Sequence, residues 1–212
     1  MKGLILNSLY SVEKSVKVSL LLAILINTFL FMTKHSIALQ MAIWVPFLII
    51  PVNAFEALKH DGESGWNKYE ITLPIKRSNI IKSKYITFLI LLMISILLTF
   101  LILYIACIFD LLSYTKLFFS FSFRGMGIIL CMAALIYPLT YLLGTAKSDA
   151  IILGSIGFAF GVFGLTSTLI PIVFRNSQDL DQAFSVTFLL ISILFFIISY
   201  YISKHIYKRK EF

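Results

Sequence analysis

The sequence predicts an all-α, polytopic membrane protein with about six transmembrane helices and both termini in the cytoplasm. Three observations support this fold class. Hydrophobic residues make up 59% of the 212 residues, which is too many for a soluble globule around one ordinary core. The apolar runs are long enough to cross a bilayer, and the basic residues concentrate in alternate loops between them.

A spanning helix needs roughly 20 mostly apolar residues, because backbone groups facing lipid must satisfy their hydrogen bonds within the helix. The runs lack the apolar and polar alternation of membrane strands, which argues against a barrel. We therefore expect one transmembrane domain over residues 1–212. Its spans are predicted at Val18–Thr33, Leu39–Leu58, Tyr85–Phe109, Gly125–Ala146, Ala150–Phe174 and Ser185–Ser203.

The Lys and Arg residues predict the orientation of these spans, since cytoplasmic loops retain the excess of positive charge. Placing both termini inside assigns 14 of the 18 basic residues to the cytoplasm. These are Lys2, Lys14, Lys17, Lys59, Lys68, Lys76, Arg77, Lys82, Lys84, Lys147, Lys204, Lys208, Arg209 and Lys210. The net charge of +8 is thus explained by topology, and we expect no nucleic-acid partner.

Residues 1–17 are expected to form an amphipathic helix along the inner membrane surface. Ile5, Leu9, Val12 and Val16 recur at helical spacing, with serines and lysines between them. The alternative is a cytoplasmic extension of the first span.

Residues 59–84 form a polar insertion of about 25 residues, longer than a connection between two helices requires. We expect Gly62 and Gly65 to break the preceding helix, Ser64 or Asp61 to cap a short helix that carries Trp66, Tyr69 and Glu70, and Pro74 to end it. Trp66 and Tyr69 lie three residues apart and can share a face of this helix, which suits an anchor in a protein groove. The alternative places both rings in the headgroup region of the membrane.

Four glycines, Gly154, Gly157, Gly161 and Gly164, recur at spacings of three and four in the fifth span. This spacing places them on one helical face, and we favour close helix packing as their role.

Ionisable residues are almost absent at mid-membrane depth, which argues against ion-coupled transporters and proton pumps. Glu56 is the one candidate, and it falls near the end of the second span. His35, His60 and His205 lie in separate regions, so we expect no metal site, and we find no catalytic constellation. Cys107 and Cys131 are expected to be buried packing thiols, although a bridge between them is the alternative.

Several short motifs resemble the permease subunits of type 2 ATP-binding-cassette exporters, in particular the phenol-soluble-modulin exporter permeases. The six-span layout and the amino-terminal helix agree with this family. The motifs are Ser64-Gly65-Trp66, Tyr69-Glu70, Thr72-Leu73-Pro74 followed by Lys76-Arg77, and Lys82-Ser83-Lys84-Tyr85.

This resemblance implies a cytoplasmic coupling helix between spans 2 and 3 that docks on an ATPase subunit. It implies that residues 1–17 are the connecting helix and that residues 164–184 form an outer re-entrant or gate segment. The implied docking residues are Asp61, Glu63, Ser64, Gly65, Trp66, Tyr69 and Glu70.

The chain has no G-x-x-x-x-G-K-[ST] phosphate-binding loop, so we expect ATP hydrolysis on a separate subunit. The family implies two copies of this ATPase per transporter, which bind ATP and Mg, and no cofactor on this chain. It further implies a second permease copy or a paralogue as partner. The expected location is a bacterial plasma membrane, with the lipid bilayer as surroundings.

A path between two permease copies would run along spans one, two and five and would be mostly apolar. Such a lining suits amphipathic peptides, the cytolytic or antimicrobial cargo that the resemblance implies, while drugs and lipids remain open. The alternative function is a non-transport immunity or sensory protein. The expected path residues are Asn27, Thr28, Asn53, Phe160, Phe163, Thr166 and Ser167.

Overall fold

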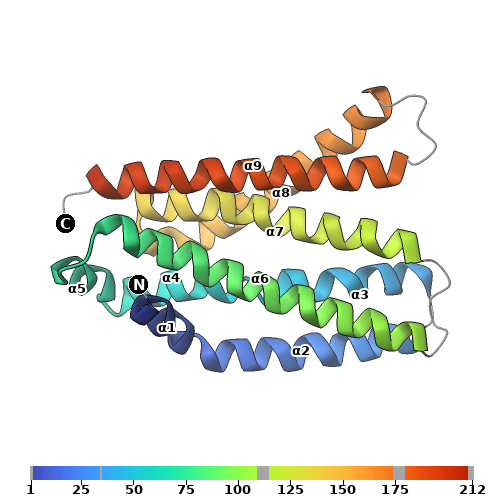
Figure 1. The fold of residues 1–212 in the computed structure, drawn as a ribbon, viewed down its shortest axis with the longest axis horizontal. Helices are drawn as coiled ribbons and strands as arrows, with labels where there is room; N and C mark the ends of the chain where they lie inside the picture. The colour runs from blue at the N-terminus through green and yellow to red at the C-terminus, as the bar shows by residue number, and fades with distance from the viewer. Residues whose placement is uncertain (1, 34, 109–114, 174–179, 210–212) are drawn as a thin grey trace.

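The computed structural model describes residues 2–33, 35–108, 115–173 and 180–209, and every regular element in these ranges is helical. Six helical stretches are long and apolar enough to cross a membrane, which confirms the predicted all-α fold with six spans, while the cytoplasmic position of the termini stays a prediction. They form an elongated bundle (Figure 1). Their bounds are Glu13–Met32, Ile37–Glu63, Arg77–Ile105, Phe118–Leu143, Thr145–Val173 and Leu180–Arg209.

The amino-terminal helix is shorter than predicted and packs differently. Helix α1 spans Lys2–Ser11, and α2 begins at Glu13 and ends at Met32. Val12 separates the two with a non-helical backbone, and the Ser11 hydroxyl donates to the Ser8 carbonyl at 2.9 Å. Ser8, which the pattern placed on the polar side, is fully buried because α1 packs on α4 and α6. Helix α1 therefore covers other helices of the protein, and its placement along a membrane surface stays a prediction.

The second span is broken in the middle. Helix α3 spans Ser36–Ile49 and α4 spans Asn53–Glu63, with Pro51 between them. Proline has no N–H and disrupts the helical hydrogen bonds around it. The Asn53 side-chain amide compensates by donating to the carbonyls of Ile49 at 3.3 Å and Ile50 at 2.8 Å.

A sharp turn connects α4 to the short helix α5, which spans Trp66–Thr72. Gly65 makes this turn with φ of +74°, a left-handed conformation that only glycine adopts without strain. Extended backbone at Leu73 and then Pro74 end α5, as the sequence predicts. The predicted cap by Ser64 or Asp61 is wrong, because Gly65 precedes α5 and no side chain of the described residues caps it, and Gly62 lies within α4. In Figure 1, α5 lies at the same end of the bundle as α1 and the carboxyl end of α9. We call this the α5 end.

The remaining helices form the centre of the bundle. Helix α6 spans Arg77–Ile108, α7 spans Thr115–Leu143, α8 spans Ser148–Val173 and α9 spans Leu180–Arg209. A 3₁₀ turn, η1, covers Thr145–Lys147 between α7 and α8. Helices α7 and α9 pack most closely, and a side chain at Gly127 would overlap the ring of Phe188. Tyr85, Phe88, Tyr137 and Phe196 form an aromatic core beside this contact.

The α7–α9 contact is also fixed at the end opposite α5. Arg124 on α7 is buried and pairs with Asp181 on α9, and its Nε donates to the Ser185 hydroxyl at 2.9 Å. Its guanidinium lies over the rings of Phe121 and Phe184 at 5.1 and 4.7 Å. This arrangement ties the first turn of α9 to α7.

Helix α8 crosses α7 and α9 obliquely, and its end projects past α9 (Figure 1). A Cβ placed at Gly154, Gly157, Gly161 or Gly164 meets nothing within 4 Å, so the four glycines contact no other helix of the described chain. The prediction that they pack a neighbouring helix is therefore wrong within one chain. Helix α8 also continues unbroken through Pro171 to Val173, so no re-entrant break occurs over residues 164–173. The rest of the predicted gate includes 174–179, outside the described residues.

The two cysteines are both free thiols. Cys131 is buried as expected and its Sγ lies 3.2 Å from the Ser192 hydroxyl of α9. Cys107 is exposed, which corrects the expectation of a buried thiol there.

Close packing at Gly127 predicts that Gly127→Ala lowers the free energy of unfolding by about 1–3 kcal/mol, because the added methyl group overpacks the α7–α9 contact. Gly154→Ala adds the same methyl group where space is open and removes a helical glycine, so it should be neutral or stabilising by up to about 1 kcal/mol. Unfolding of the two purified variants in detergent measures the difference. Equal midpoints would contradict the described α7–α9 packing.

Candidate functional site

Two aromatic side chains form the outward surface of α5. Tyr69 is 57% exposed and Trp66 is half-buried, with ring centroids 5.3 Å apart. The indole N–H of Trp66 has no hydrogen-bond partner among the described residues. Glu63 and Ser64 are exposed just before the turn. We call Glu63, Ser64, Trp66 and Tyr69 the α5 patch, a surface with acidic, hydroxyl and aromatic groups.

A buried ion pair lies behind this patch. Lys84 on α6 pairs with Asp61 on α4, and the two side chains are only 4% and 5% exposed. The Lys84 ammonium also donates to the Ser8 hydroxyl of α1 at 2.9 Å. The Lys84 side chain therefore holds α1, α4 and α6 together. Helix α4 precedes α5 in the chain and α6 follows it.

Tyrosine hydroxyls extend the same network to α7 and α9. Tyr137 donates to the Lys84 carbonyl at 3.2 Å. The Tyr85 hydroxyl lies 2.8 Å from that of Ser199 and 2.9 Å from that of Ser203, both on α9. Each bond lies in a buried region, where leaving a polar group without a partner is costly. At the α5 end, polar contacts thus join α1, α4, α6, α7 and α9 to one another.

Glu70 points inward from α5. It is 1% exposed, and its Oε2 has no hydrogen-bond partner among the described residues. Burial raises the pKa of the Glu70 carboxyl above its ordinary value, the Lys84 ammonium lowers it, and the Asp61 carboxylate raises it further. A buried carboxyl group that makes no ion pair with any described residue is unusual.

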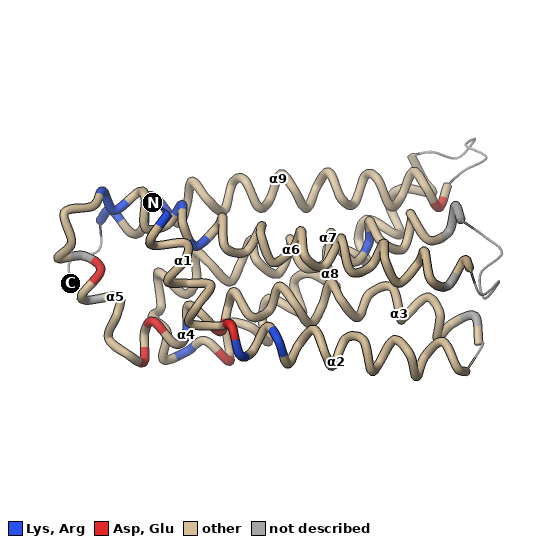
Figure 2. Tube along the Cα trace, turned by 60° about the horizontal axis from the view of Figure 1, so that its bottom comes forward, with Lys and Arg blue, Asp and Glu red and all other residues tan. Residues whose placement is uncertain are grey.

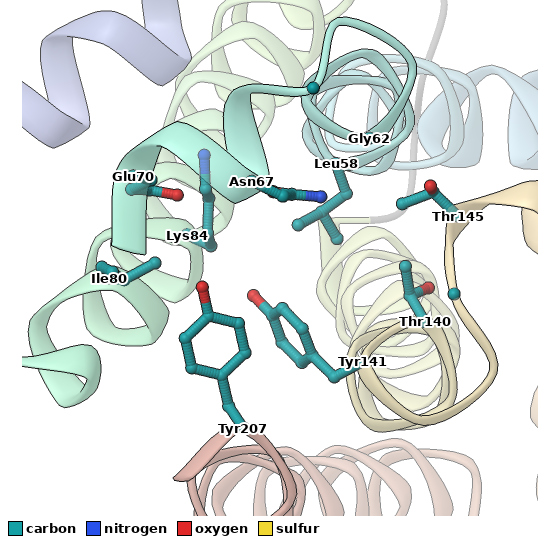
Figure 3. Close-up of a pocket in the computed structure, with 12 residues that line it drawn as sticks. Leu58, Gly62, Asn67, Glu70, Ile80, Lys84, Thr140, Tyr141, Thr145 and Tyr207 are labelled. Atoms are coloured by element: carbon teal, nitrogen blue, oxygen red, sulfur yellow. The ribbon is translucent and has the colours of Figure 1, made fainter. Parts of the chain in front are cut away.

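Glu70 faces a hollow of about 210 Å³ between α5 and the helix ends. Figure 3 shows the hydroxyls of Tyr141 and Tyr207 and the amide of Asn67 directed toward the same space. The hollow lies between α5 and the ends of α7 and α9, which contribute to its wall. Its lining consists of Leu58, Gly62, Gly65, Asn67, Glu70, Ile80, Lys84, Thr140, Tyr141, Gly144, Thr145 and Tyr207.

Comparison with known proteins identifies the family. The model of the ABC-2 family transporter protein matches residues 3–208, nearly the whole chain. The chain belongs to this family. This protein is therefore a membrane permease component of an ABC-type transporter, a transport subunit that is not itself catalytic. Searches of curated proteins and of solved structures found no match.

The predicted docking residues of this permease divide into an outer and an inner set. Glu63, Ser64 and Tyr69 are exposed and Gly65 and Trp66 are half-buried, so these five are accessible to a partner. The two remaining docking residues are buried acids: Asp61 is paired with Lys84, and Glu70 faces the hollow behind α5. They can act on docking only by holding α5 in place. The docking role itself stays a prediction.

Sequence reasoning missed Lys84 and Ser8 as structural residues. It assigned Lys84 to the basic residues that set topology, yet a signal was present in its spacing. Lys84 lies three residues after Ile81 and four before Phe88, on the stripe of α6 that faces the core. A lysine on an apolar stripe needs a buried acid as partner, and Asp61 fills this role.

The predicted path residues do not form one surface in a single chain. Asn27 and Thr28 are on α2, which packs on α3. Four others are on α8, which packs on α7 and α9, namely Phe160, Phe163, Thr166 and Ser167. Thr28 and Phe160 are exposed. Asn53 is buried in the α3–α4 break described above, and its amide also donates to Ser19 at 2.9 Å.

The α8 members and Asn27 are mostly turned inward. Phe163 contacts the rings of Trp44, Phe184 and Phe188, and the buried Thr166 hydroxyl donates to the Val162 carbonyl at 2.8 Å. The half-buried Ser167 donates to the Gly164 carbonyl at 2.7 Å. Asn27 is buried, and its Oδ1 has no partner among the described residues. A path role for any of these residues stays a prediction.

The buried pair predicts a strongly non-additive mutant cycle. Lys84→Met leaves the Asp61 charge buried without a partner and should cost about 3–5 kcal/mol of unfolding free energy. Asp61→Asn combined with Lys84→Met removes both charges and should cost clearly less than the sum of the two single variants.

Unfolding of the purified variants measures this cycle. Lys59→Met is the control, because Lys59 pairs with Asp149 at 2.8 Å on the exposed surface and should change stability little. Additive costs at positions 61 and 84 would contradict the ion pair.

Proposed function

We propose that this permease belongs to an ATP-driven exporter and that the α5 patch docks on a separate ATPase subunit. The observation that carries this proposal is the position of α5 at the end of the bundle, with the exposed Tyr69 beside the half-buried Trp66 and a buried ion pair behind them. Aromatic residues at the centre of a patch are typical anchors of protein interfaces.

The contacts behind the patch support a coupling role. Movement of α5 would pull on α4 directly and on α1 and α6 through Lys84. Helix α6 is in turn bonded to α7 and α9 through Tyr137 and Tyr85. Rigid-body motion of a docked ATPase would therefore reach the spanning helices without any ion relay in the membrane.

The distribution of charge supports a cytoplasmic position for α5. Figure 2 shows most Lys and Arg residues of the described chain at the α5 end. The excess of basic residues marks the cytoplasmic side of membrane proteins. In this proposal both termini and the docking ATPase lie inside the cell, and the chain resides in a bacterial plasma membrane.

The proposed complex contains two ATPase subunits, which hold ATP and Mg, and a second permease copy or a paralogue. The most open helices of the described chain support such an assembly. Leu21 and Phe29 on α2 are 59% and 69% exposed, and Leu153 and Leu165 on α8 are 72% and 64% exposed. Apolar faces of this kind can meet lipid or a partner copy.

For the cargo, we propose amphipathic peptides such as cytolytic or antimicrobial peptides of the phenol-soluble-modulin type. The support is the apolar character of α2 and α8 combined with hydroxyl groups at Thr28 and Ser167. A peptide with one apolar and one polar face could use both kinds of contact, whereas an ion or a sugar would find few polar groups.

The docking proposal predicts that Trp66→Ala with Tyr69→Ala abolishes recovery of an ATPase subunit when the permease is purified from native membranes in mild detergent. The reason is the loss of the aromatic anchor. Mass spectrometry of the recovered partners measures this result. Tyr104→Ala is the control, since Tyr104 is 70% exposed on α6 and far from the patch.

Recovery of the same ATPase with the double variant would contradict docking through the α5 patch. Recovery of no ATPase with the parent chain would favour the immunity or sensory function instead.

The path proposal predicts that Thr28→Ala with Phe160→Ala slows export of an amphipathic peptide severalfold at unchanged permease levels, because both side chains are exposed on the proposed lining. Export into the medium measures the rate. Leu101→Ala on the exposed face of α6 serves as the control. Unchanged export by the double variant would remove these two residues from the path.

A further inference from the structure

The hollow beneath α5 is a defined internal space and not a packing defect of the usual size. Its volume of about 210 Å³ is more than ten times the space that one water requires. Residues from α4, α5, α6, α7, η1 and α9 contribute to its wall. Its wall is mostly apolar and includes the buried carboxyl of Glu70, which has no hydrogen-bond partner at Oε2 among the described residues.

Among the described residues, Glu70 makes no ion pair across the hollow. The charged residues of its described lining are Glu70 and Lys84. Lys84 is committed to Asp61 and Ser8 and makes no ion pair with Glu70. Two carboxylates therefore share one ammonium group, and Oε2 of Glu70 has no partner among the described residues.

Neutral groups around Glu70 complete a set of hydrogen-bond acceptors. In Figure 3 the phenol oxygens of Tyr141 and Tyr207 point to the space that Glu70 faces, and Asn67 lies at its edge. The two tyrosine rings meet edge to face with centroids 5.4 Å apart. A carboxylate with phenol oxygens and aromatic rings is a favourable environment for the N–H groups of a cation.

We propose that this hollow binds one organic cation, an ammonium or guanidinium group that donates its N–H bonds to Glu70. The cation is either a free solute or a basic side chain of a partner protein. The site goes beyond the proposed export function, because an isolated permease can bind the cation without ATPase or cargo. Bound there, the cation would join α5 to α7 and α9 across the space that now separates them.

A multivalent metal fits this space less well. No group of three or more His, Cys, Asp or Glu that could hold a metal ion occurs among the described residues. Calcium and magnesium take six or more oxygen ligands, usually with several carboxylates. Glu70 is the one lining carboxylate of the described chain, and a single positive charge matches it.

Binding should depend on pH through Glu70. A protonated Glu70 cannot pair with a cation, and burial raises its pKa, so affinity should fall as the pH falls. The groups that face or approach Glu70 are Asp61, which favours its protonation, Lys84, which opposes it, and the hydroxyls of Tyr141 and Tyr207.

The test is calorimetric titration of the full-length permease in nanodiscs with Nα-acetyl-arginine amide and Nα-acetyl-lysine amide at constant ionic strength. The neutral Nα-acetyl-citrulline amide has nearly the shape of the arginine probe and no charge. We expect saturable binding of at least one cationic probe and none of the citrulline probe. Glu70→Gln should weaken the binding at least tenfold.

Glu56→Gln is the matched control, because it removes an exposed acid from the same end of the molecule and should leave binding unchanged. The parent protein provides a second measurement that needs no variant, since its affinity should fall between about pH 8 and about pH 5. Absence of binding by the parent, or equal binding by Glu70→Gln, would overturn the proposal.

The two sources of the cation are separated by repeating the titration on permease purified together with its natural partners. Loss of probe binding in that complex assigns the site to a basic side chain of a partner. Unchanged probe binding assigns it to a free solute. Both results support the cation site, and neither depends on whether the partner is an ATPase.

Discussion

The ion pair between Asp61 and Lys84 is the interaction on which the α5 end of this permease depends. It joins α4 to α6 in a nearly water-free position and brings in α1 through Ser8. Burying two charges costs several kcal/mol in desolvation, so such a pair adds little net stability compared with apolar packing. The pair instead fixes the positions of α4 and α6 relative to each other, because moving one charge away would leave the other buried without a partner. The direction of the chain as it enters α5 follows from this constraint.

The two ends of the bundle differ in how their helices are held together. Helices α7 and α9 pack tightly through Gly127 and are tied by Arg124 and Asp181 at the far end. Helices α2 and α8 remain largely exposed and are free to meet lipid or another subunit. At the α5 end the interior is polar and contains a hollow. A rigid centre can transmit movement that is applied at α5. The hollow beneath α5 must be filled for this, because an empty space between α5 and the centre would absorb the movement.

Sequence reasoning recovered the parts of this structure that depend on composition and local chemistry. The length of the apolar runs predicted the six spans, and Pro74 predicted where α5 ends. It did not find that Ser8 is buried or that Asp61 and Glu70 face inward, because those facts depend on which helices meet. The Asn53 contacts belong to the same class, since a break at Pro51 predicts unpaired carbonyls but not the side chain that satisfies them. Helical periodicity identifies a buried face, whereas the partner of that face is set by tertiary packing.

The most direct test of the account is photo-cross-linking in native membranes. A photoreactive amino acid in place of Ser64 lies in the α5 patch, and the same group in place of Leu97 lies on the exposed face of α6. Docking through the α5 patch predicts a cross-link from position 64 to an ATPase subunit and none from position 97. Cross-links to lipid alone from position 64, with the permease intact and well expressed, would contradict the central claim.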